Sequence, residues 1–169
     1  MRRFYFLLPL LLWSGMAWAA DVWTYFGDPA GAFTVAVPAK PQAQTAQLPG
    51  PNGKTLTQAS YIVERSDGAL VVVVIDFSPV PDNGHMLNDA ANNIKQTAAS
   101  GLSDSPIALD GLTGHVIRFK DKDGNQYEDR MFYVGRKIYQ VMTVEAPNVA
   151  PASHAVGQRF LTSLHFTKH

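Results

Sequence analysis

The sequence predicts an α+β fold, in which helices flank an antiparallel β-sheet of about six to seven strands as an α/β/α sandwich. Short segments rich in β-branched and aromatic residues recur along the chain, and short turn sequences join several of them, as in hairpins. Residues 71–75 are apolar without alternation, which indicates a central strand covered on both faces. Two segments with apolar residues at helical spacing would supply that cover.

The first residues predict a cleaved signal peptide over 1–19. Two arginines precede an apolar run, and the small-x-small sequence at 17–19 is typical of a signal peptidase site. General secretion is favoured over the twin-arginine route, because no Ser or Thr precedes the arginines and the apolar run is long. The alternative is an uncut anchor, but Ser14 and Gly15 interrupt the run below the about 20 residues of a membrane span.

Cleavage of 19 of the 169 residues would leave one domain, 20–169, in the bacterial periplasm without a stable membrane anchor. The loss of Arg2 and Arg3 from the 14 basic residues leaves 12 against 14 acidic ones, or a charge of −2. This balance does not suggest nucleic acid as a partner. The chain has no cysteine, which excludes disulfides, thiolate metal sites, thiol catalysis and a lipid on a signal-peptide cysteine.

The first half of the mature chain predicts four strands. Two short strands are expected at 21–26 and from about 31 to Val37, where apolar residues alternate with smaller or polar ones. Residues 38–53 are rich in Pro, Gln, Gly and Ala, and are expected to form a loop that is presented to a partner. A hairpin follows, with strands at 54–65 and 69–77.

A helix is expected next, over 86–100, from apolar residues at helical spacing. Asp82 or Asn83 is a candidate N-cap, and Gly101 is placed where the C-terminus of a helix favours a residue with positive φ.

The last third predicts three strands and a second helix. The strands are expected at 115–120, 126–134 and 137–146, with a type II′ turn at Gly135-Arg136 between the last two. Residues 152–166 predict an amphipathic helix that ends near Leu164.

This order of elements resembles the PsbP-like family and the related bacterial DcrB-type envelope proteins. The resemblance rests on "FTVAVPAKP", "LDGLTGHVIRF", "MFYVGRKIYQVMTVE" and "AVGQRFLTSLHF", and spans most of the mature chain. It implies a PsbP-like fold and a non-enzymatic accessory or binding role, as in a photosystem subunit and a nuclear transport factor of this fold. These relatives share no set of functional residues, so the resemblance assigns none.

The stretch "DKDGN" at 121–125 has oxygen-bearing residues at the alternating positions that open an EF-hand calcium loop. The sixth position should be Gly and the twelfth Glu, but they are Gln126 and Phe132. The flanking segments are also strands rather than helices. The stretch therefore predicts the loop of a β-hairpin, with weak calcium binding as an alternative.

This hairpin has two possible registers. A five-residue loop over 121–125 places Arg118 opposite Glu128, whereas a two-residue turn at 123–124 places Arg118 opposite Asp129. Either register gives the arginine an acidic partner across the strands.

No spacing in the sequence predicts a catalytic, metal or cofactor site. The five histidines lack metal-ligand spacing, and no Gly-x-Ser-x-Gly motif is present. The candidate ligand or partner surface consists of His115, Arg118, Tyr127, Trp23 and Tyr25.

The predicted function is therefore a non-catalytic periplasmic binding or adaptor protein of the cell envelope, acting on an envelope protein or a small ligand. The alternatives are a hydrolase with a site assembled from loops, and weak calcium binding through 121–125. Convergence of His115, Arg118 and nearby acids in one pocket would favour the hydrolase.

Overall fold

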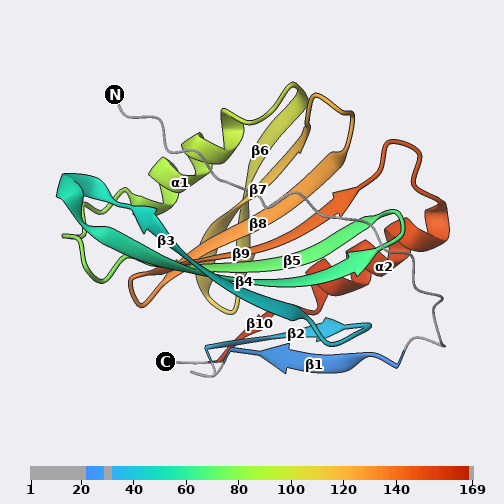
Figure 1. Cartoon of the computed structure of the whole chain (residues 1–169), viewed down its shortest axis with the longest axis horizontal. Coiled ribbons are helices and arrows are strands. Elements are labelled where there is room, and N and C mark those ends of the chain that lie inside the picture. Colours follow the sequence, from blue (N-terminus) through green and yellow to red (C-terminus); the bar gives the residue numbers. More distant parts are fainter. Residues whose placement is uncertain (1–21, 29–31, 168–169) are drawn as a thin grey trace.

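The computed structural model describes residues 22–28 and 32–167, and the predicted signal peptide at 1–19 lies outside these residues. The described chain forms a seven-stranded sheet, a three-stranded sheet and two α-helices (Figure 1). The large sheet has the order β3 (Gln42–Pro49), β4 (Thr55–Arg65), β5 (Gly68–Asp76), β9 (Lys137–Glu145), β8 (Gln126–Val134), β7 (Leu112–Lys120), β6 (Ser100–Leu109). The small sheet has the order β1 (Thr24–Gly27), β2 (Phe33–Val37), β10 (His165–Phe166). The helices are α1 (Met86–Lys95), α2 (Pro151–Thr162) and a short 3-10 turn, η1 (Pro51–Gly53).

All neighbouring strands of the large sheet are antiparallel, and β5 lies between β4 and β9. Residues 69–75 of β5 are buried without alternation, as expected for a strand covered on both faces. The predicted hairpins of β4 with β5, of β7 with β8 and of β8 with β9 are confirmed.

The two α-helices cover opposite faces of the large sheet. Ala91 and Ile94 of α1 belong to one apolar cluster with Met131 of β8. Phe160 of α2 belongs to another with Phe132, the next residue of the same strand. Because successive strand residues point to opposite faces, the helices lie on different sides. The predicted α+β sandwich is confirmed.

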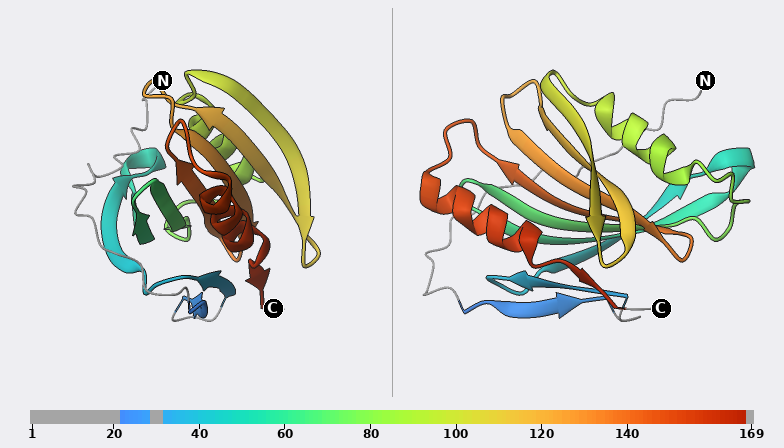
Figure 2. Two further views of the ribbon diagram at one scale, coloured as in Figure 1. Left: turned by 90° about the vertical axis from the view of Figure 1, so that its right-hand side faces the viewer. Right: turned by 180° about the vertical axis from the view of Figure 1, so that it is seen from behind.

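The small sheet lies on the same side as α2 (Figure 2). Phe33 of β2 is fully buried in the cluster that contains Phe160. Phe166 of β10 packs edge-on against Phe132 of the large sheet, with 5.2 Å between ring centroids. The strands expected at 21–26 and from about 31 to Val37 correspond to β1, which begins at Thr24, and to β2, which begins at Phe33; residues 21 and 31 lie outside the described residues.

The loop expected at 38–53 is wrong for half of its length, because β3 occupies Gln42–Pro49 and pairs with β4 throughout. Nearly all of β3 is exposed, and only Leu48 is partly buried. An edge strand is stabilised by its backbone ladder on one side, so it needs no apolar face that a sequence pattern could reveal.

The first helix is shorter than expected, since α1 ends at Lys95 rather than at residue 100. Its N-cap is His85 rather than Asp82 or Asn83. Gly101 does adopt positive φ (+64°), but it belongs to β6, a second exposed edge strand that the sequence did not predict.

Two predicted details near the C-terminus are also corrected. Gly135 and Arg136 both have positive φ (+54° and +66°), which defines a type I′ turn instead of type II′. The second helix ends at Thr162 rather than near Leu164, and residues 165–166 form β10 instead of a last helical turn. None of the helices in the described residues is long and apolar enough to cross a membrane.

Candidate functional site

The "DKDGN" stretch forms a five-residue loop between β7 and β8. Oδ1 of Asp121 accepts hydrogen bonds from the backbone N–H groups of Asp123 (2.9 Å) and Asn125 (3.0 Å). Oδ2 accepts from the Asn125 side chain (3.0 Å) and from the Tyr127 hydroxyl (3.1 Å). Burial opposes ionisation of Asp121, but these bonds outweigh it and hold the pKa of the carboxyl below its usual value. The carboxylate thus serves to close the turn.

The loop length selects the register, and Arg118 lies opposite Glu128 rather than Asp129. Lys120 lies opposite Gln126 in the same ladder. The next strand continues these rows, with Thr143 beside Glu128 and Glu145 beside Gln126. Residues two apart on a strand share a face, so both rows project toward α2.

A groove of about 390 Å³ lies between α2 and strands β7, β8 and β9. We call it the α2 groove. Its charged and long polar side chains include Arg118, Lys120, Glu128, Glu145, His154 and Gln158. Strand β7 contributes the two cations, β8 and β9 contribute one acid each, and α2 contributes the histidine and the glutamine.

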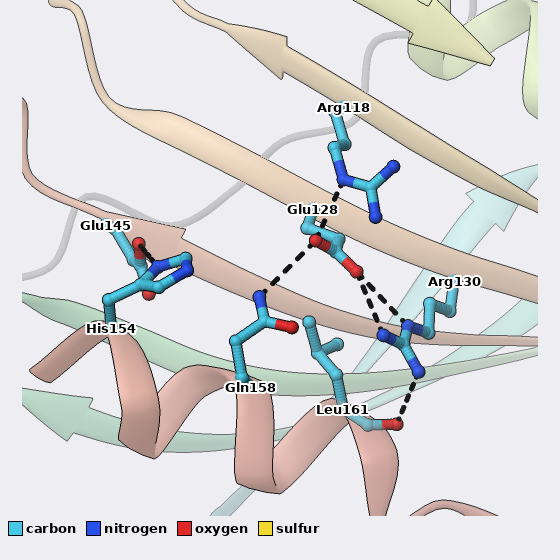
Figure 3. A network of polar contacts seen from close by, with 7 residues as sticks. All are labelled: Arg118, Glu128, Arg130, Glu145, His154, Gln158 and Leu161. Carbon is cyan, nitrogen blue, oxygen red and sulfur yellow. Dashed lines mark hydrogen bonds and ion pairs between the residues drawn. The ribbon is translucent and has the colours of Figure 1, made fainter. Parts of the chain in front are cut away.

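Glu128 lines the groove and links Arg118, which also lines it, to Arg130, which does not (Figure 3). Its Oε2 accepts a hydrogen bond from Nε of Arg118 at 2.9 Å. Its Oε1 accepts from Nε and Nη2 of Arg130 at 3.2 and 3.1 Å. Arg130 also donates from Nη1 to the backbone oxygen of Leu161 in α2, at 3.0 Å. The chain of contacts therefore ties the sheet to the helix.

The environment of Glu128 favours its charged form. Burial opposes ionisation, but the hydrogen bonds and charges of Arg118 and Arg130 outweigh it and hold the pKa of the carboxyl below its usual value. The side chain of Arg118 is 51% exposed, whereas that of Glu128 is 11% exposed. The outer part of the arginine therefore stays accessible while its Nε is held.

Glu145 and His154 form the second polar contact of the groove, with 2.9 Å between Oε2 and Nδ1 (Figure 3). The glutamate side chain is 8% exposed and the histidine side chain 54%. Gly157 allows this packing, because a Cβ there would lie 2.7 Å from Oε1 of Glu145 and 3.1 Å from Cγ2 of Thr143.

His115 does not belong to the α2 groove. Its Nδ1 lies 2.8 Å from Oδ1 of Asp104, and its Nε2 lies 3.1 Å from Oδ1 of Asn88 in α1. Lys95 of α1 pairs with the same aspartate at 2.9 Å. His115 and Arg118 are three residues apart on one strand and face opposite sides of the sheet. They do not converge.

The other residues of the predicted surface are dispersed. Tyr127 borders the α2 groove, but its ring lies on the α1 side of the sheet, where it stacks on Phe119 with 4.6 Å between centroids. Trp23 packs against the apolar core, with the guanidinium carbon of Arg159 4.2 Å from its ring centroid. Tyr25 is 77% exposed on β1. Neither Trp23 nor Tyr25 lines the groove.

Lys120, Glu128, Glu145, His154 and Gln158 were not predicted as site residues. The alternation of polar residues on three consecutive strands could have indicated the first three. The two residues of α2 carry no such signal, because only packing of the helix places them over the sheet. The described residues hold no group of three or more His, Asp or Glu side chains arranged for a metal ion.

No family model and no curated protein matches the sequence. Among solved structures, the chain is similar to the solution structure of cyanobacterial PsbP (CyanoP) from Synechocystis sp. PCC 6803. The TM-score is 0.56 at 11% sequence identity, and the match covers 92% of this chain and 99% of that one. The similarity confirms the expected PsbP-like fold, and at this identity it shows the fold alone.

Proposed function

We propose that the chain is an exported, non-catalytic binding or adaptor protein of the bacterial cell envelope, and that the α2 groove holds its ligand or partner. The observation that carries the proposal is the half-exposed side chain of Arg118, whose guanidinium a buried glutamate orients at the groove. An accessible polar group held in place by its neighbours is typical of recognition sites.

The periplasmic location follows from the signal peptide predicted at 1–19. The PsbP-like fold agrees with a binding or accessory role only at the level of the fold, because one fold hosts many functions.

The alternative of a loop-built hydrolase is less well supported. It required His115, Arg118 and nearby acids to converge, and the first two lie on opposite faces of the sheet. Both ring nitrogens of His115 contact Asp104 or Asn88, which gives the histidine a role in holding α1 on the sheet.

The alternative of weak calcium binding is also less well supported. Both carboxylate oxygens of Asp121 already accept two hydrogen bonds each within the loop. A cation at this carboxylate would compete with those bonds.

Site-specific cross-linking in living cells tests the proposal. A photo-reactive amino acid replaces Gln126 in the groove of the full-length protein, and a control variant carries it at the exposed Gln44 on β3. We expect a discrete cross-linked species from position 126 only. Equal cross-linking from both positions, or turnover of a cell-wall or lipid substrate by the purified protein, would contradict the proposal.

A further inference from the structure

We propose that the α2 groove recognises a carboxylate group, carried by a small organic acid or by the C-terminus of a peptide, through Arg118 and Lys120. The inference rests on the proposed binding function and names the chemistry of its ligand.

Arg118 is oriented before any ligand arrives. Its Nε donates to Glu128, which Arg130 holds from the other side, and Arg130 is in turn fixed to the backbone of α2. Both Nη atoms of Arg118 remain without a hydrogen bond or ion pair to another described residue, as Figure 3 shows for the residues around it. Two N–H groups in one plane match the two oxygens of a carboxylate. Restraint of the guanidinium through Nε lowers the entropy lost on binding.

Lys120 supplies a second cation beside the guanidinium of Arg118. It lies two residues along β7, on the same face as Arg118, and their Cα atoms are therefore about 7 Å apart along the strand. Its side chain is exposed, and it forms no ion pair within the described part of the chain. Both side chains can therefore contact one anion at the β7 side of the groove.

The acids of the groove moderate its attraction for anions. Glu128 and Glu145 line the same groove, so an incoming anion is repelled as well as attracted. Both effects double for a phosphate dianion, because Coulomb energy scales with charge, so charge alone does not favour one anion over the other. The preference for a carboxylate rests on shape, because the planar guanidinium matches its two coplanar oxygens.

The rest of the groove accommodates more than the anion. Its volume of about 390 Å³ is within the roughly 300–1,000 Å³ of small-molecule sites. The amides of Gln126 and Gln158 line it, and Nε2 of Gln158 already donates to Oε2 of Glu128 at 3.5 Å, so Gln158 offers chiefly its oxygen while Gln126 offers both donor and acceptor. Such groups suit the peptide units or hydroxyls that lie next to a carboxylate.

The test uses NMR titration of the exported protein with four probes: succinate, tri-alanine, tri-alanine with an amidated C-terminus, and inorganic phosphate. We expect succinate or tri-alanine to shift the backbone amide signals of the groove, and the amidated peptide to leave them in place. A response to succinate alone identifies a small acid, and a response to tri-alanine identifies a peptide terminus. Either response supports the proposal.

Three variants locate the binding. Arg118→Gln should weaken binding by about tenfold or more, since charge-assisted bonds to a carboxylate are lost. Lys120→Gln should weaken it less, and it leaves the contacts of Glu128 intact. Lys122→Gln removes the same charge from the exposed loop outside the groove, and should change affinity by less than about twofold.

Several results would overturn the inference: no binding of any carboxylate probe, equal binding of both forms of tri-alanine, tighter binding of phosphate, or an unchanged affinity in Arg118→Gln. If cross-linking from position 126 persisted in those cases, the proposed binding function would stand and only the ligand class would be wrong.

Discussion

Two adjacent acids of β8, Glu128 and Asp129, have opposite environments. Glu128 faces α2 and pairs with two arginines. Asp129 faces the other side, is fully buried, and accepts one hydrogen bond, from Nε2 of Gln140 at 3.2 Å. Its Oδ1 has no hydrogen-bond partner among the described residues. Burial raises the pKa of Asp129 from its ordinary 3.8 to about 7.

Asp129 should therefore make stability depend on pH, and Asp129→Asn should remove that dependence. A folded-state pKa above the unfolded value means that ionisation costs stability as pH rises from about 4 to 7. We expect the variant to match the parent near pH 4 and to exceed it at pH 8 by roughly 2–4 kcal/mol. Urea unfolding at both pH values measures the difference.

Asp123→Asn, in the exposed loop, is the control and should show little difference at either pH. A stability gain of Asp129→Asn that was equal at pH 4 and pH 8 would count against a buried, titrating carboxyl.

At the scale of elements, α1 is held on the sheet by a polar cluster at its outer side. Asp104 of β6 contacts both Lys95 of α1 and His115 of β7, and His115 also contacts Asn88 of α1. Burial opposes ionisation of Asp104, but the bonds from Lys95 and His115 hold the pKa of its carboxyl below the usual value. This one carboxylate joins a helix to an edge strand that buries almost nothing.

Replacement of Asp104 by Asn should loosen α1 and β6 selectively. We expect a loss of about 1 kcal/mol, because two contacts to charged or polar partners weaken. Native-state hydrogen exchange of the variant and the parent should show that the substitution accelerates exchange more in α1 and β6 than in the β4–β5 hairpin. Ser103→Ala on the same exposed strand is the control. Uniform acceleration across all strands would show that the cluster has no local role.

At the scale of the whole molecule, six carboxyl groups of the described residues have a shifted pKa, in two sets with opposite effects. Burial raises the pKa of Asp129. In five other carboxyls burial also opposes ionisation, but hydrogen bonds, and in four of them nearby cations, outweigh it and lower the pKa. These five are Asp76, Asp82, Asp104, Asp121 and Glu128. The stability that the five supply is present above their unfolded pKa values of 3.8 to 4.5, and is lost as pH falls through the lower folded values.

The two sets together predict an acidic optimum of stability. The five carboxyls lose their contribution below about pH 4, and Asp129 costs stability progressively above it. We expect the free energy of unfolding to be largest between about pH 4 and pH 5, and to decline toward pH 7. A series of urea unfolding curves from pH 2 to pH 9 measures this profile. A plateau that extended unchanged from pH 5 to pH 9 would contradict it.

The sequence by itself determined the central part of the fold. The apolar run at 71–75, the hairpin turns and the two helical periodicities report local burial, so they predicted β4, β5, β7, β8, β9 and the positions of α1 and α2. The sequence also limited the "DKDGN" hairpin to two possible registers, because only two loop lengths fit the turn residues.

The tertiary structure decided what periodicity does not encode. The exposed strands β3 and β6 are held by backbone ladders rather than by buried side chains, so their sequences resemble loops. The pairing of Arg118 with Glu128 became definite only when the loop took five residues. The α2 groove exists because α2 packs His154 and Gln158 over three strands, and the direction in which a helix crosses a sheet depends on side chains distant in sequence.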